Sequence, residues 1–161
     1  MPKCTRQAAL VTSIVDGDTI DVLINGQTYR VRYIGIDTPE RDEYFYNPAT
    51  AFNQNLVFNK TVTLVKDVSE TDTFDRLLRY IIVGDTFVNY ELVRQGYAQA
   101  ARYPPDIACS SFFESAEFAA QTTDSGMWMP TPTPFVPPAG GGGGGNCDPS
   151  YPSVCIPSST S

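Results

Sequence analysis

The sequence contains no histidine among its 161 residues, and this absence excludes several kinds of chemistry. Without an imidazole the chain cannot form a Ser-His-Asp or Cys-His triad, a histidine general base or a histidine-ligated zinc site. Any hydrolytic reaction would therefore depend on carboxylates, arginines and hydroxyl groups, together with a metal ion where one is bound.

Long hydrophobic runs and basic residues are also scarce. No apolar run approaches the roughly 20 residues that span a bilayer, so we expect no membrane association. Lysine and arginine number 11 against 18 aspartates and glutamates, which gives a net charge of −7. Proteins that coat nucleic acids are usually basic, and this balance argues against a generic protein of that kind.

Cysteines are few, and none stand in the Cys-x-x-Cys spacing of zinc or thioredoxin-type sites. Their even number, with Cys147 close to Cys155, favours disulfides and therefore an oxidising compartment. More than one pairing is open, and we expect Cys147–Cys155 and Cys4–Cys109. No signal peptide follows Met1, so the protein is either cytosolic or has had its signal peptide removed. Because the cysteines favour disulfides, we expect a secreted protein whose signal peptide is not part of this sequence.

The composition changes sharply near Pro130. Residues 130–146 are rich in proline and include a glycine run, which predicts a flexible linker. Residues 147–161 form a short cysteine-containing tail, and we expect this C-terminal part to be disordered. Residues 5–129 then form one domain of ordinary size.

Strands predominate in the first part of that domain. The β-rich segments cover residues 8–15, 19–24, 27–36, 61–66 and 77–83. The pair Asn25-Gly26 favours a tight hairpin turn between two of them.

Helical patterns interrupt and follow these strands. One begins with Asn47 as N-cap and Pro48 as first helical residue and continues to about Asn59. A short helix over residues 89–95 stops at a glycine, and an amphipathic helix covers residues 107–122. Together the elements predict a mainly β protein with α-helices (β+α), built as a five-stranded, OB-type Greek-key barrel with three helices.

Asp18 is the first residue whose placement points to a site. It shares a strand face with Ile20 and Val22, so it is the charged end of an apolar row at the barrel mouth. A carboxylate in that position needs a partner or a metal ion. The alternative is a turn aspartate whose oxygens bind backbone N–H groups, since Asp-Gly-Asp-Thr is favourable turn chemistry.

The third strand leads to a second polar group. Arg32 lies in this strand, which runs into Asp37-Thr38-Pro39-Glu40. Pro39 restricts the backbone, so Asp37 and Glu40 lie on a fixed turn at a strand end, where sites on rigid scaffolds are common. Alone, these residues also fit a solvated arginine and a polar turn.

Arg76 precedes the last strand in the same way, and the set is chemically coherent as a whole. Two aspartates can hold a cation that prefers oxygen ligands, such as Ca²⁺. A glutamate can orient or deprotonate a water molecule. Two arginines can bind a phosphate bidentately and stabilise charge in its transition state.

The segments that carry these residues resemble the staphylococcal nuclease (thermonuclease-like) family. The matching segments occur in family order across about residues 8–129: Asp16–Thr19, Arg32–Glu40, Pro48–Phe52, Thr71–Leu77 and Val88–Gly96. The resemblance implies a five-stranded barrel with three helices. It also implies Ca²⁺-dependent, sequence-nonspecific hydrolysis of DNA and RNA phosphodiester bonds to 3′-phosphate products.

Roles for individual residues follow from the resemblance. Asp18, Asp37 and the backbone carbonyl of Thr38 would bind Ca²⁺. Glu40 would act on the attacking water, and Arg32 and Arg76 would bind the scissile phosphate.

The chain departs from the family pattern beside Arg76. Phe74 replaces the usual tyrosine and so lacks a hydroxyl that could reach a nucleotide phosphate. Asp75 replaces the usual glycine, and an aspartate tolerates a left-handed turn better than most residues. The added negative charge places phosphate affinity in question. We still expect Phe74 to contact substrate.

Aromatic residues suggest which nucleic acid is preferred. Bases could stack on Tyr44, Tyr46 or Tyr103, which favours single-stranded or frayed DNA and RNA; packing is the alternative role for these rings. A local positive spot is expected from four residues: Arg30, Arg32, Arg76 and Arg79. We expect the protein to act as a monomer.

Two other functions compete with the nuclease hypothesis. One is a non-catalytic OB-type module that binds nucleic acid or protein. The other is a glycosidase that uses Asp37 and Glu40 as a carboxylate pair, although the arginines fit phosphate better than sugar.

Overall fold

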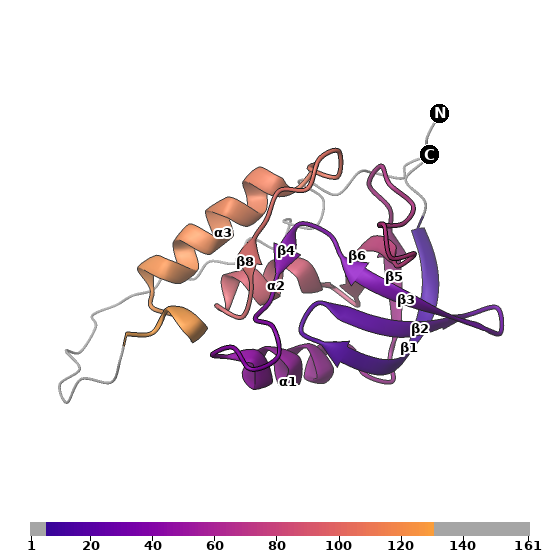
Figure 1. Ribbon diagram of the computed structural model, residues 1–161, viewed down its shortest axis with the longest axis horizontal. Coiled ribbons are helices and arrows are strands. Elements are labelled where there is room, and N and C mark those ends of the chain that lie inside the picture. Colours follow the sequence, from indigo (N-terminus) through magenta and orange to yellow (C-terminus); the bar gives the residue numbers. More distant parts are fainter. Residues whose placement is uncertain (1–5, 131–161) are drawn as a thin grey trace.

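Five strands close into a barrel in the computed structural model, which describes residues 6–130 (Figure 1). The barrel strands are β1 (Arg6–Asp16), β2 (Thr19–Ile24), β3 (Gln27–Tyr33), β5 (Thr61–Val65) and β6 (Leu77–Val83). Neighbouring strands are antiparallel in the order β3-β2-β1-β5-β6, and a parallel pairing of β3 with β6 closes the barrel. The predicted barrel is therefore confirmed. Cys4, Cys147, Cys155 and nearly all of the predicted linker and tail lie outside the described residues, and those predictions stay predictions.

The predicted third strand ends earlier than its sequence suggests. Asn25 and Gly26 form the expected tight turn, both with positive φ angles. The chain leaves the barrel after Tyr33 and turns at Gly35, where φ is +80° and a Cβ atom would lie 2.7 Å from the Phe113 ring. It then forms a separate short strand, β4 (Ile36–Asp37), which pairs with β8 (Gln99–Ala100).

Three α-helices surround the barrel as predicted: α1 (Tyr46–Val57), α2 (Val88–Arg94) and α3 (Ser110–Thr122). A short strand, β7 (Thr86–Phe87), and a 3-10 helix, η1 (Gly126–Trp128), complete the described part. The predicted N-cap at Asn47 is wrong: Phe45 precedes α1 with a φ of +73°, and no side chain caps the helix. No helix within residues 6–130 has the length and apolar character needed to cross a membrane.

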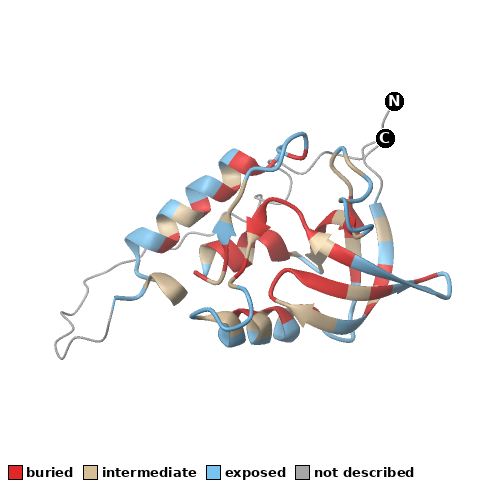
Figure 2. Ribbon diagram, viewed as in Figure 1, coloured by how far each residue is buried: buried red, intermediate tan, exposed pale blue. Residues whose placement is uncertain are grey.

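One hydrophobic core has two parts, inside the barrel and between the barrel and the helices, and Figure 2 shows buried residues along the strands and in the helices. Fully buried aliphatic side chains fill the barrel, among them Val11, Ile20, Val22, Val31, Leu64 and Ile81. Aromatic rings of Tyr80 (β6), Phe87 (β7) and Phe113 (α3) join the strands to α3, with centroid distances of 5.5 to 6.2 Å. Helix α2 packs against α3, β6 and α1, so it links both parts.

Two buried asparagines fix the ends of the strands. Asn53 of α1 accepts a hydrogen bond from the Tyr33 hydroxyl (2.6 Å) and donates one to the carbonyl of Asp16 (2.9 Å). Asn89 of α2 donates to the Ile34 carbonyl and accepts from a backbone N–H of β6, both at 2.9 Å. The ends of β1 and β3, where the predicted site residues lie, are therefore held by both helices.

Candidate active site

A cavity of about 320 Å³ at the barrel mouth brings the predicted catalytic and metal-binding residues together. Its lining consists of Asp16, Asp18, Thr19, Arg32, Asp37, Thr38, Pro39, Glu40, Arg76 and Tyr103. These residues come from the ends of strands and from the turns that follow them. Among the aromatic residues predicted to contact substrate, Tyr103 reaches this cavity and Phe74 lines the pocket beside it. We name this space the catalytic cavity.

Asp18 is buried, with 5% of its surface exposed, and protein groups surround its carboxylate. Oδ1 accepts a hydrogen bond from the Thr19 hydroxyl (3.1 Å), and Oδ2 accepts one from the Thr38 N–H (2.9 Å). A Cβ atom at Gly17 would lie 2.8 Å from the Thr38 side chain, so only glycine allows this approach. The first turn and the turn after β4 are therefore joined through Asp18.

Arg32 is fixed by four acceptors. Nη1 donates to the carbonyls of Tyr33 (3.0 Å) and Ile36 (2.9 Å) and lies 3.2 Å from Asp18 Oδ2. Nη2 lies 3.4 Å from Asp37 Oδ1. Since only 14% of its side chain is exposed, the guanidinium has little freedom to move.

Two carboxylates, Asp18 and Asp37, contact this guanidinium, and a third, Asp16, lines the same cavity and interacts with it electrostatically. Burial raises the pKa of Asp16 to about 6, and the nearby Asp18 charge adds to the rise. Burial also raises the pKa of Asp37, although Arg32 opposes that shift. Sequence reasoning missed Asp16 as a site residue; its position across the turn from Asp18 was the available signal. This end of the cavity holds excess negative charge.

Glu40 lines the cavity with an exposed side chain. Among residues 6–130 its carboxylate forms no hydrogen bond or ion pair, so its oxygens are available to a water molecule. Its backbone is fixed instead: the Glu40 N–H donates to Glu43 Oε1 (2.7 Å), and the Glu43 N–H donates to the Glu40 carbonyl (2.8 Å). Sequence reasoning also missed Glu43.

Arg76 is held on a turn by a single carboxylate. Asp72 accepts hydrogen bonds from Arg76 Nε (2.7 Å), from the Arg76 N–H (3.0 Å) and from the Phe74 N–H (2.8 Å). Burial acts to raise the pKa of Asp72, but these hydrogen bonds outweigh it and lower the pKa. Asp75 adopts the expected left-handed conformation, with φ of +64°.

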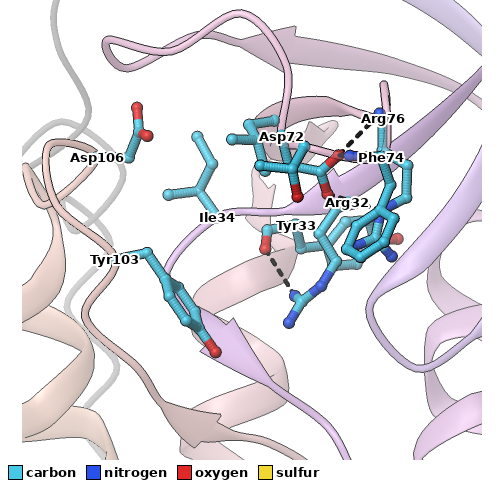
Figure 3. A pocket seen from close by; sticks show the side chains of 11 residues that line it. Arg32, Tyr33, Ile34, Asp72, Phe74, Arg76, Tyr103 and Asp106 are labelled. Carbon is cyan, nitrogen blue, oxygen red and sulfur yellow. Dashed lines mark hydrogen bonds and ion pairs between the residues drawn. The ribbon is translucent and has the colours of Figure 1, made fainter.

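A second pocket, of about 290 Å³, adjoins the cavity through Arg32, Arg76 and Tyr103 (Figure 3). Figure 3 shows Phe74 and Tyr103 on opposite sides of this pocket, with the Arg32 guanidinium between them. Phe74 is 75% exposed, and the Arg76 guanidinium lies 5.4 Å from its ring centroid. The pocket, named the Tyr103 pocket below, thus offers exposed aromatic faces beside two positive charges.

The predicted spot of four arginines is wrong. Arg30 forms two hydrogen bonds with Asp21, at 2.8 and 3.2 Å, on the outer face of the barrel. Arg79 is buried and pairs with Glu70 at 3.2 Å. Each of these two charges is neutralised by its neighbour, so only Arg32 and Arg76 reach the cavity. Tyr46 lies in α1 and does not line the cavity either.

The donor atoms at the cavity fit a cation that prefers oxygen. The described residues contain no group of three His, Cys, Asp or Glu side chains that could hold a metal ion by themselves. A cation would therefore combine Asp18 and Asp37 with oxygens from the main chain, water or substrate, which is the mixed set that Ca²⁺ accepts. The excess negative charge beside Arg32 favours such an ion.

Comparison with known proteins identifies the family. Residues 30–130 match the family described as "Staphylococcal nuclease homologue". The chain belongs to this family. It is 34% identical over 128 residues to the "Thermonuclease" of Staphylococcus intermedius, and the aligned region covers 76% of each protein. It is also 34% identical over 127 residues to the "Micrococcal nuclease" of Shigella flexneri, which covers 73% of this chain and 71% of that protein.

Proposed function

We propose that this member of the staphylococcal nuclease family is a nuclease that hydrolyses phosphodiester bonds of DNA and RNA, with Ca²⁺ as its metal ion. The observation that carries the proposal is the catalytic cavity. Two guanidiniums, two aspartates able to bind a metal ion and one glutamate without a side-chain partner among the described residues line this one space. The names of the relatives support the same activity.

The metal-binding role falls to Asp18, Asp37 and the main-chain carbonyl of Thr38. A bound Ca²⁺ supplies positive charge that stabilises the phosphate and the charge that develops on it. The hydrogen bond from Thr38 N–H to Asp18 supports this set, because it holds the Thr38 backbone against that carboxylate.

Arg32 and Arg76 bind the oxygens of the scissile phosphate. Guanidiniums match phosphate geometry with paired N–H groups, and their fixed positions stabilise transition-state charge without reorganisation. Each already contacts a carboxylate, so the phosphate shares their donors with Asp37 and Asp72.

Glu40 accepts a proton from the attacking water, or orients that water, on the open side of the cavity. The water oxygen forms the new bond to phosphorus as the bond to the 5′ oxygen breaks. The product strand then ends in a 3′-phosphate. The Glu43 contact, which fixes the Glu40 backbone, supports this role.

The substrate of this nuclease is single-stranded or frayed nucleic acid without sequence preference. Unpaired bases can stack on Phe74 and Tyr103, and stacking is tolerant of sequence because every base has a flat face. The net charge of −7 opposes long-range attraction of a polyanion, so binding depends on the metal and these local contacts. The protein acts as a secreted monomer in this proposal.

A cleavage assay with a fluorescent single-stranded oligonucleotide tests the proposal. We expect cleavage with Ca²⁺, none with EDTA, and a rate about 10³-fold lower for Glu40→Gln. Asp85→Asn, an exposed substitution between β6 and β7 with the same change of charge, is the matched control and should cleave at the normal rate. An oligonucleotide that the wild type binds but never cuts would favour the non-catalytic binding module instead.

A further inference from the structure

A third cavity, of about 370 Å³, adjoins the catalytic cavity through Asp37, Thr38 and Pro39. Glu43, Tyr44, Gln99 and Met127 complete its lining, and we name it the Tyr44 pocket. It shares no lining residue with the Tyr103 pocket, which meets the catalytic cavity at the two arginines. The three spaces therefore follow one another, with the catalytic cavity between two pockets.

The chain itself connects the two outer pockets. Gln99 of β8 lines the Tyr44 pocket, and Tyr103, four residues later, lines the other. The chain therefore passes from one outer pocket to the other within four residues, and the three adjoining spaces together form one groove.

We propose that the Tyr44 pocket is a second nucleoside subsite. It takes the base and sugar on the opposite side of the scissile phosphate from the nucleoside in the Tyr103 pocket. The proposal rests on the nuclease function above, and it assigns the substrate strand a second anchoring point.

The Tyr44 ring is exposed but firmly supported. It is 72% exposed, and its centroid lies 5.3 Å from that of Phe45. Phe45 in turn lies 5.4 Å from Tyr97, which stacks on Phe52 of α1 at 4.3 Å. This row of rings ties the loop to the helix and so orients the outer tyrosine before any ligand arrives. A pre-oriented aromatic face binds a base with little loss of conformational entropy.

The charges in the pocket define what it binds. No lysine or arginine lines it, while Asp37 and Glu43 are acidic, so a phosphate is disfavoured there. Gln99 offers an exposed amide that can both donate to and accept from a base edge, and it forms no hydrogen bond within the described residues. Met127 adds a polarizable thioether that packs well on flat rings. The occupant is therefore an uncharged nucleoside.

Oligonucleotides with one cleavable phosphodiester and methylphosphonates elsewhere test this assignment on the full 161-residue chain. Three versions carry bases on both sides of the cleavable bond, or an abasic residue on one side or the other. We expect Tyr44→Ala to lower kcat/KM about 10-fold on the first version, in line with the loss of one stacked base. Removing the base that occupies the Tyr44 pocket should then lower kcat/KM of this variant no further. Removing the base that occupies the Tyr103 pocket should lower its kcat/KM as much as it does for the wild type.

Two variants complete the design. Tyr103→Ala should show the reverse pattern: removing the base that occupies the Tyr103 pocket should lower its kcat/KM no further. Tyr29→Ala removes a partly exposed tyrosine of β3, away from the groove, and should match the wild type.

Binding of a fully uncleavable oligonucleotide, followed by fluorescence anisotropy, separates this proposal from the nuclease proposal. If the wild type cleaves normally and Tyr44→Ala equals it in kcat/KM and in binding, the subsite is overturned and the nuclease stands. Full sensitivity of Tyr44→Ala to both abasic residues also overturns it. If the wild type cleaves nothing but Tyr44→Ala binds the oligonucleotide about 10-fold more weakly, the subsite stands and the nuclease proposal fails.

Discussion

The two ends of the catalytic cavity each hold an arginine, but the carboxylates around the two arginines differ in number and in pKa. At one end Arg32 contacts Asp18 and Asp37, with Asp16 in the same cavity, and the pKa values of Asp16 and Asp37 are raised. At the other end one carboxylate, Asp72, pairs with Arg76, and its pKa is lowered. The first end has excess negative charge and the second is balanced.

This difference suggests that the two arginines have different roles: one supports the folded structure as well as the site, and the other serves the site alone. Arg32 contacts two backbone carbonyls and two carboxylates at the barrel mouth, so it contributes to the folded structure as well as to the site. Arg76 lies on a turn and is more exposed, with 28% of its side chain accessible. Its contribution should be confined to the reaction. Substitutions at the two ends can test this separation.

The largest effect is expected for Arg32→Ala. Removing the guanidinium leaves a buried Asp18 carboxylate without its countercharge, which should lower the free energy of unfolding by about 3 kcal/mol. The rate on oligonucleotides should also fall by about 10³-fold. Urea unfolding and the cleavage assay measure both. Arg30→Ala, which breaks an exposed pair, is the control and should cost at most about 1 kcal/mol. An Arg32→Ala protein as stable as the wild type would contradict the comparison.

Arg76→Ala should lose activity without losing stability. The rate should again fall about 10³-fold, while the free energy of unfolding changes by less than about 1 kcal/mol, because the lost ion pair is partly solvated. Arg76→Lys keeps the charge but not the planar fork, so its rate should lie between those of the wild type and the alanine variant. A loss of stability equal to that of Arg32→Ala would show that both ends support the fold.

The smallest effect concerns Asp16 and pH. Its pKa rises from 3.8 to about 6 on folding, so between these values the folded protein binds more protons than the unfolded chain. The free energy of unfolding of metal-free protein should therefore fall as the pH rises through this window. Asp16→Asn keeps the acceptor for the Asp18 N–H and removes the charge. Thermal unfolding should show it about 1 kcal/mol more stable than wild type at pH 7, after allowance for solvent screening, and equally stable at pH 4. Equal stability of the two proteins at both pH values would contradict the assignment.

Sequence patterns predicted the barrel because its signals are local. Alternating apolar residues predicted β2. Asp18 has the same side-chain spacing as these residues, which placed it correctly at the cavity. Asp16 had a local signal beside Asp18, but other features that were missed depend on contacts across the chain. Gln99 lies in β8, which pairs with β4, and Phe45, which precedes α1 without a capping side chain, contacts the distant Tyr97. Nothing in the local sequence near either residue carries that information.

The parallel pairing of β3 with β6 has a consequence for the timing of activity. It sets Arg32 beside Leu78, and Arg76 directly precedes the same strand, so one long-range contact fixes both arginines. Pairings between distant parts of a chain are slow steps in folding. A chain that has formed its early hairpins but not this pairing has not yet brought the two arginines together, so the catalytic cavity is completed late in folding.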